Sequence, residues 1–143
     1  MNVSRADFDW TVRWIRADAL AIVVAAVWAM TVTHGSWVWF FVLFLVPDVS
    51  MTGYLFGSRA GAIAYNLGHM FAWPVALLAI ALATHRSFTT TAALSWISHI
   101  AFDHALGYGV KLPTSFEQTS LGPIGRSRRE QRTIDRASGL HDV

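Results

Sequence analysis

Apolar residues are concentrated in four long runs that are separated by short polar connections. The runs are residues 17–33, 37–56, 60–84 and 88–106. Each run is close to the roughly 20 residues that an α-helix needs to cross ~30 Å of hydrocarbon. Short connections make neighbouring helices antiparallel. The pattern therefore predicts an all-α integral membrane bundle of four transmembrane helices with up-down topology.

Two prolines fall inside these runs. Pro47 has no backbone N–H, so we expect the second helix to be interrupted at Pro47-Asp48. Pro74 predicts a plain kink in the third helix. The interruption opens backbone groups beside the carboxylate of Asp48, which suits a functional site but also occurs in ordinary packed bundles.

The composition agrees with a membrane protein. Hydrophobic residues make up 54% of the 143 residues and charged residues only 14%, whereas soluble domains average about 25% charged residues. Seven tryptophans and nine phenylalanines fit aromatic belts at the membrane interfaces. The chain has no cysteine, which excludes disulfides, thiolate metal sites and cysteine nucleophiles.

The basic residues predict the orientation of the bundle. If both termini lie on one side of the membrane, that side holds ten of the eleven Lys and Arg residues, and the other side holds only Arg86. The ten are Arg5, Arg13, Arg16, Arg59, Lys111, Arg126, Arg128, Arg129, Arg132 and Arg136. This bias places the chain in the inner (cytoplasmic) membrane as a multi-pass protein with both termini cytoplasmic.

The same reading divides the chain into two parts. Residues 1–124 form the four-helix membrane domain. Residues 125–143 are charged and lack an apolar stripe, so we expect a basic, flexible cytoplasmic tail. Its cations can contact anionic lipid headgroups, which makes the bilayer, and not nucleic acid, the predicted partner. Homo-oligomerisation is left open.

Three ionisable residues from different helices are predicted at one depth. Counting helical rise from the cytoplasmic end of each helix places Asp48, His69 and His99 roughly 11–14 Å from the inner interface, at ~1.5 Å per residue. Asp103 and Asn66 lie one turn nearer the cytoplasm. His99 and Asp103 are four residues apart and share a helix face. The polar groups are thus expected to meet in the inner half of the bilayer.

These groups need partners. A charged aspartate in hydrocarbon costs ~2.5–3.5 kcal/mol on insertion scales. Binding of a metal, a protonated hydrogen-bond network or a water-filled cavity would each offset that cost. The bland interpretation is a buried His–Asp network that only specifies how the helices pack. Because four groups converge, we favour a functional site.

The residue types suit a divalent metal. Two neutral imidazoles with one or two carboxylates suit zinc, iron or manganese. We predict His69, His99 and Asp103 as ligands, with Asp48 as a fourth ligand or a general base, and these four as the catalytic residues. No local signature such as HExxH is present. Further polar residues near the same depth are predicted to bind substrate: Asn66, Tyr65, His104, Tyr108, Lys111 and Asp18.

Three separated motifs resemble a known family. They are LVPDVSMTGY at 45–54, YNLGH at 65–69 and WISHIAFDHALGYGVK at 96–111. Together they resemble the small bacterial integral membrane proteins of domain-of-unknown-function family 4260, over roughly residues 12–125. The resemblance implies a four-helix membrane protein that carries these same polar positions, and it implies no reaction.

The chain departs from that family pattern at a few positions. His104 follows the helix-four aspartate where the family usually has arginine. Ser120 stands where the family tends to have a loop histidine, so no role of that histidine carries over. Asp18 is a shorter equivalent of the glutamate that the family tends to show in the first helix.

The sequence leads to one preferred function and two alternatives. The preferred hypothesis is a membrane-embedded enzyme that acts on a lipid-soluble or amphipathic small molecule. A bound metal would support hydrolysis or an iron-dependent oxidation, and without metal the same residues could catalyse an isomerisation or cyclisation. The alternatives are a proton- or ion-conducting element or small transporter, and a non-catalytic membrane subunit.

Overall fold

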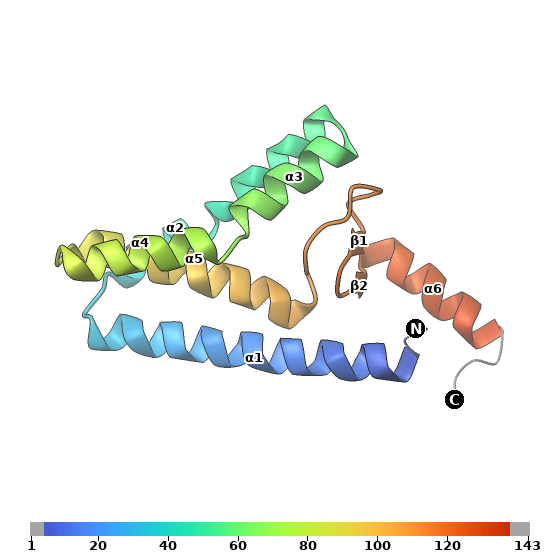
Figure 1. Ribbon diagram of the computed structural model, residues 1–143, viewed down its shortest axis with the longest axis horizontal. Helices are drawn as coiled ribbons and strands as arrows, with labels where there is room; N and C mark the ends of the chain where they lie inside the picture. The colour runs from blue at the N-terminus through green and yellow to red at the C-terminus, as the bar shows by residue number, and fades with distance from the viewer. Residues whose placement is uncertain (1–4, 138–143) are drawn as a thin grey trace.

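The computed structural model describes residues 5–137, and it is predominantly helical (Figure 1). Residues 138–143, the end of the predicted tail, and residues 1–4 lie outside the described part. The helices are α1 Arg5–Val32, α2 Trp37–Phe44, the 3₁₀ helix η1 Pro47–Phe56, α3 Ser58–Gly68, α4 Ala72–Ala83, α5 Ser87–Leu106 and α6 Gly125–Ala137. Two short antiparallel strands, β1 Gln118–Thr119 and β2 Gly122–Pro123, precede α6.

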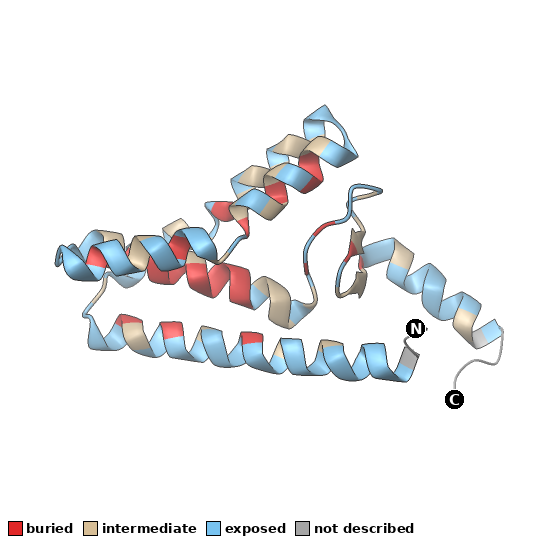
Figure 2. Cartoon of the chain, in the orientation of Figure 1, coloured by how far each residue is buried: buried red, intermediate tan, exposed pale blue. Residues whose placement is uncertain are grey.

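Helix α5 is the centre of the fold. It contacts α1, α2 and α4, and most of its residues from Thr90 to Ala101 are buried (Figure 2). Hydrogen bonds from side chains to backbone carbonyls join it to two of these helices: the Ser95 hydroxyl of α5 donates to the Phe40 carbonyl of α2 at 2.6 Å, and the Arg16 guanidinium of α1 donates to the Ala105 carbonyl of α5 at 2.7 Å. The hydrophobic core between these helices includes Met30 and Leu94.

Proline breaks two helices at neighbouring points. Pro47 follows the end of α2, because a proline there cannot donate to the carbonyl of residue 43 and its ring would clash with that carbonyl. Pro74 acts in the same way on residue 70, and α3 accordingly ends at Gly68 before α4 begins at Ala72. The kink predicted at Pro74 is therefore a complete interruption. Beyond the two breaks, η1 and α3 pack on each other as a hairpin that leaves the α1–α4–α5 layer at an angle (Figure 1).

The segment after α5 folds back toward α3. Gly107 ends α5 in the left-handed conformation, with a φ of 97°. The side-chain amide of Asn66 then holds the backbone of Lys111 at both groups: Lys111 N donates to Asn66 Oδ1 at 2.8 Å, and Asn66 Nδ2 donates to the Lys111 carbonyl at 3.0 Å. This double contact fixes the loop against the hairpin.

The basic segment 125–137 is exposed but helical, a feature that the sequence interpretation did not include. The side chain of Glu117 caps the start of this helix. Its carboxylate accepts from Ser127 N at 2.8 Å, from the Ser127 hydroxyl at 2.6 Å and from Arg126 N at 3.2 Å. These hydrogen bonds satisfy N–H groups that the first turn of a helix leaves without partners, and they hold the pKa of Glu117 below its usual value.

Three helical segments are long and apolar enough to cross a membrane. They are Ala6–Val32, Trp37–Phe56 and Ser58–Ala83. Most of their apolar side chains are exposed on the protein surface, as lipid-facing side chains are. Helix α5, the predicted fourth span, is not among these segments in the described part of the chain. It carries Ser, Thr, His and Asp, which its burial among the other helices accommodates. The chain is thus an all-helical protein with segments suited to a membrane.

Candidate metal centre

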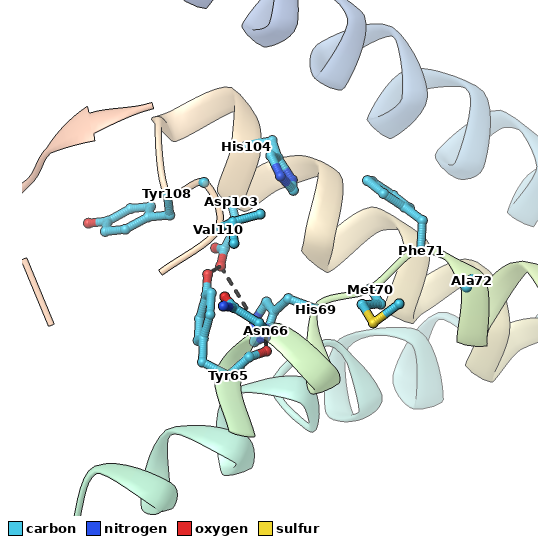
Figure 3. A pocket seen from close by; sticks show the side chains of 11 residues that line it. Tyr65, Asn66, His69, Met70, Phe71, Ala72, Asp103, His104, Tyr108 and Val110 are labelled. Atoms are coloured by element: carbon cyan, nitrogen blue, oxygen red, sulfur yellow. Dashed lines mark hydrogen bonds and ion pairs between the residues drawn. The ribbon is translucent and has the colours of Figure 1, made fainter. Parts of the chain in front are cut away.

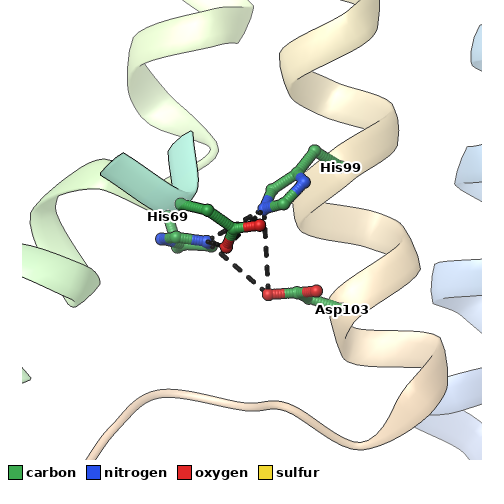
Figure 4. Close-up of side chains that lie close together, drawn as sticks. His69, His99 and Asp103 are labelled. Atoms are coloured by element: carbon green, nitrogen blue, oxygen red, sulfur yellow. Dashed lines mark hydrogen bonds and ion pairs between the residues drawn. The ribbon is translucent and has the colours of Figure 1, made fainter. Parts of the chain in front are cut away.

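The side chains of Asp48, His69, His99 and Asp103 converge at the point where the two helices break. Figure 4 shows His69, His99 and Asp103 pointing toward one another. One ligand atom from each residue lies within 4.8 Å of the other three. His69 Nε2 lies 3.1 Å from His99 Nε2 and 3.6 Å from Asp103 Oδ2. Asp48 Oδ1 lies 3.4 Å from His99 Nε2 and 3.9 Å from His69 Nε2. The depth argument from the sequence thus selected four residues that do meet.

Three elements supply these residues, each for a local reason. Asp48 is in the first turn of η1, directly after the proline that ends the preceding helix. His69 is the residue that follows α3. His99 and Asp103 are one turn apart on the same face of α5. The indole N–H of Trp96 donates to the Gly68 carbonyl at 2.8 Å and so fixes the broken end of α3 on α5.

The hydrogen bonds of His69 fix its tautomer. Its Nδ1 lies 2.8 Å from the Tyr65 carbonyl, which can only accept, so Nδ1 carries the proton. The lone pair of the neutral ring is then on Nε2, which faces His99 Nε2 and the two carboxylates. His99 Nδ1 has no hydrogen-bond partner among the described residues, so no contact fixes the tautomer of His99. Either a metal ion bound by the four groups or a proton on His99 Nε2 makes this arrangement favourable.

The spacing around the two histidine nitrogens fits a small divalent ion. A tetrahedral zinc site with bonds of ~2.0–2.1 Å separates its ligand atoms by roughly 3.3–3.4 Å. The separations that involve the histidine nitrogens run from 3.1 to 3.9 Å and so bracket that value. Burial also suits this role, because both histidines are buried and the Asp103 side chain is only 15% exposed.

Tyr65 supports two of the four residues. Its hydroxyl donates to Asp103 Oδ2 at 2.7 Å, its carbonyl accepts from His69, and its ring stacks on the His69 imidazole with centroids 3.7 Å apart. Outer contacts of this kind orient metal ligands and raise their basicity. Asp48 differs, because its side chain is 39% exposed and it accepts no hydrogen bond of this kind within the described residues.

A cavity of about 430 Å³ adjoins the cluster (Figure 3). His69 and Asp103 form part of its wall. The other lining residues are Tyr65, Asn66, Met70, Phe71, Ala72, His104, Tyr108, Gly109 and Val110. A volume of this size is within the range of small-molecule sites. The cluster is therefore accessible to a ligand from one side.

Comparison with known families decides the relationship of the chain. The model of the family described as Domain of unknown function (DUF4260) matches residues 12–124, more than three quarters of the chain. The chain belongs to this family. No curated protein and no solved structure is significantly similar to it. The four clustered residues all lie within the matched DUF4260 region.

The remaining predicted site residues of this DUF4260 protein lie at different distances from the cluster. His104 lines the cavity, stacks on Phe71, and has Nδ1 2.8 Å from the Ile100 carbonyl. Tyr108 lines the outer part of the cavity. Asp18 is exposed on α1 and lies outside the cluster. The amide of Asn66 borders the cavity but is engaged with the loop backbone.

Lys111 is buried beneath Tyr65 and does not line the cavity. Its ammonium group donates to the Phe116 carbonyl at 3.1 Å and lies over three rings, the nearest being Phe116 at 4.1 Å. Burial lowers the pKa of the Lys111 amine below its usual value, and the Asp103 carboxylate offsets part of that shift. Lys111 thus contacts the ring of Tyr65, which supports His69 and Asp103, without reaching the cavity.

Sequence reasoning missed two supporting residues. In the sequence, Trp96 is one more apolar or interfacial aromatic residue, because nothing there shows that its N–H donates to the carbonyl at the end of α3. In the sequence, Glu117 is an isolated acid, because the helix that it caps, α6, shows no apolar periodicity and was not predicted. Ser120, at the departure from the DUF4260 pattern, accepts from Val110 N at 3.1 Å and so closes the loop.

Proposed function

We propose that this protein is a membrane-embedded, metal-dependent hydrolase. The observation that supports it is the convergence of two imidazole nitrogens and two carboxylate oxygens within 4.8 Å of one another, beside a cavity, in a chain with membrane-spanning segments. Zinc, iron or manganese suits this donor set. A divalent ion lowers the pKa of bound water and polarises a carbonyl group, which is the chemistry of hydrolysis.

The surroundings of the four residues indicate one role for His69, His99 and Asp103 and another for Asp48. His69, His99 and Asp103 are held by helix α5 and by Tyr65, so they are the ligands. Asp48 is more exposed and is not held in this way, so it is the general base. It accepts a proton from water as the water oxygen attacks the carbonyl carbon of the substrate, and it returns that proton to the leaving group as the bond to the carbonyl breaks.

The finer topology belongs to the same proposal. With α5 as a fourth span and the basic residues inside, both termini lie in the cytoplasm and the chain resides in the inner membrane. The cluster then lies in the inner half of the bilayer. A lipid-soluble or amphipathic substrate reaches it without leaving the membrane.

The direct contact between the two histidines favours one alternative. A proton shared between His69 Nε2 and His99 Nε2, 3.1 Å apart, would also satisfy these two nitrogens. Chains of His and Asp in membranes occur in proton pathways. In that case the protein would be a proton-conducting element, and Asp48 and Asp103 would relay protons to and from the histidine pair.

Metal analysis of detergent-purified protein separates these functions. The hydrolase predicts about one zinc, manganese or iron per chain, lost in His69→Ala and His99→Ala, together with metal-dependent cleavage of an acyl ester. Metal-free protein that carries protons across liposome membranes would overturn the hydrolase and establish the alternative. The variant Asp48→Asn sharpens the test, because it should keep the metal and lose the cleavage.

A further inference from the structure

We propose that the ligand of the 430 Å³ cavity is an uncharged amphiphile with one hydrocarbon chain, whose carbonyl ester or amide group lies at the metal centre. The chemical class of the ligand rests on the function proposed above. Its polarity, orientation and route rest on the cavity itself.

The polar groups of the cavity wall are unevenly distributed along its length. Tyr108 lies toward the segment that follows α5, and Asn66, His69 and Asp103 occupy the middle (Figure 3). The ring of His104 stacks on Phe71 and so lies nearer the other end. The other end is lined by Met70, Phe71 and Ala72. A ligand that matches this wall has a polar end, a reacting group next to it and a hydrocarbon end.

The long axis of the cavity runs along the predicted membrane normal. Residues 70–72 are at the middle of the apolar segment Ser58–Ala83, which places them near the centre of a bilayer. Tyr108 and Val110 come after the last residue of α5 and so lie at the boundary of the predicted bilayer. Met70 and Ala72 are exposed on the protein surface, so hydrocarbon surrounds this end of the cavity. The ligand enters sideways from the bilayer, with its chain toward the membrane centre.

The charges near the cavity select a neutral ligand. Asp103 is the one acidic residue among the lining residues, and the proposed metal engages its carboxylate, so none is left for a cationic headgroup. No lysine or arginine is among the eleven residues that line it. The nearby ammonium group of Lys111 is turned to the Phe116 carbonyl and to aromatic rings, and the Arg16 guanidinium is engaged with the Ala105 carbonyl. Phosphate recognition in proteins depends on such cations or on helix N-termini. A phosphate or sulfate headgroup therefore has no counter-charge here apart from the metal.

The volume limits the part of the ligand that lies in the cavity to one chain. About 430 Å³ is near the lower end of the roughly 300–1,000 Å³ that small-molecule sites occupy. A headgroup of a few polar atoms with part of one chain fits this volume. A two-chain lipid would leave its second chain in the surrounding bilayer, outside the site.

Photolabelling in nanodiscs tests the ligand class independently of catalysis. The probe is a single-chain monoacylglycerol with a diazirine at the end of its acyl chain, and the competitors are decanoylglycerol, decyl phosphate and decylammonium. We expect labelling at residues 70–72, reduced at least tenfold by decanoylglycerol and little by the two charged competitors. Equal competition by decyl phosphate would overturn the neutral-ligand inference.

A matched pair of variants tests the location. Ala72→Trp fills the apolar end of the cavity, whereas Ala76→Trp adds the same ring one turn further along α4 on an exposed position outside the lining residues. We expect labelling to fall at least tenfold in A72W only, with metal content and thermal stability equal in both variants. Equal labelling of A72W and A76W would overturn the site. Specific labelling without metal or ester cleavage would overturn the hydrolase and leave the neutral-amphiphile site established.

Discussion

His69 Nε2 lies 3.1 Å from His99 Nε2, although the two residues are 30 positions apart in the chain. Two neutral imidazoles do not approach through their lone pairs unless a metal ion or a proton lies between them. The Nδ1 hydrogen bond of His69 to the Tyr65 carbonyl leaves Nε2 free for that purpose. The pair is therefore the feature that a test of the proposed function should address first.

Removing the α5 half of the cluster separates ligand binding from packing. We expect His99→Ala and Asp103→Ala each to lose the bound metal, and the double variant to be no better, because each change removes a ligand. If the residues only stabilise the packing, each single change leaves a buried polar group without its partner, which lowers the free energy of unfolding by about 1–3 kcal/mol. The double change then restores part of that stability. Metal content and thermal unfolding of all three variants provide the measurement.

Ser98→Ala is the control for that series, since Ser98 is buried on the same helix and its hydroxyl has no partner among the described residues. It should keep both metal and stability. A double variant that regains stability, in a parent protein that never carried metal, would establish the packing interpretation.

Tyr65→Phe should weaken metal binding while the fold stays intact. The change removes only the hydroxyl that donates to Asp103, whereas the ring and the carbonyl contact to His69 remain. Loss of such an outer hydrogen bond typically costs about 10–100-fold in metal affinity. Titration with a competing chelator measures this. Tyr54→Phe is the matched control, because the Tyr54 hydroxyl is buried without a partner among the described residues; equal affinities in both variants would remove the role of Tyr65.

Asn66→Ala should release the segment 107–124 from the hairpin. The variant leaves the N–H and carbonyl of Lys111 without their side-chain partner, at about 1–3 kcal/mol for each group that stays buried. We expect a lower unfolding temperature and faster proteolysis within the segment. Gln118→Ala removes a nearby side-chain amide that takes no part in the contact between Asn66 and Lys111, and it should leave both quantities unchanged. Proteolysis equal to that of N66A would show that this contact does not hold the loop.

The start of α6 should depend on pH through Glu117. Its folded-state pKa is lowered by the hydrogen bonds from Ser127 and Arg126, so its stabilisation of α6 is fully present above the unfolded-state pKa of about 4.3. It is lost as the pH falls through the lower folded-state value. The amide NMR shifts of Arg126 and Ser127 follow this transition. Glu117→Gln should abolish it and Glu130→Gln, exposed on the same helix, should not; an unchanged transition in E117Q would exclude the cap.

Cysteine labelling tests the orientation that the basic residues predict. Ser36→Cys and Ser87→Cys are exposed in the two connections expected outside, and Arg129→Cys is exposed on α6. A membrane-impermeant thiol reagent added to intact cells should label the first two and not the third. Because the natural chain has no cysteine, the unmodified protein is the blank. Labelling of R129C from outside would reverse the topology and, with it, the depth assigned to the cluster.

The sequence alone indicated the segments suited to a membrane and the four residues that converge. Apolar runs of helical length are a property of composition, and three of them recur as helical segments able to span a bilayer. Asp48, His69, His99 and Asp103 were found because ionisable groups are costly in hydrocarbon, so their depth along each helix restricts where partners can be. Counting residues from the helix ends was sufficient for this step.

The tertiary structure decided how those residues meet. A sequence shows that Pro47 and Pro74 weaken a helix, but not that the two breaks lie together and bring Asp48 and His69 to α5. It also does not show that α5, which has too many polar residues to be as apolar as the other segments, is covered by α1, α2 and α4. Side-chain contacts such as Tyr65 with Asp103 and Asn66 with Lys111 join residues 38 and 45 positions apart, and only packing determines such pairs.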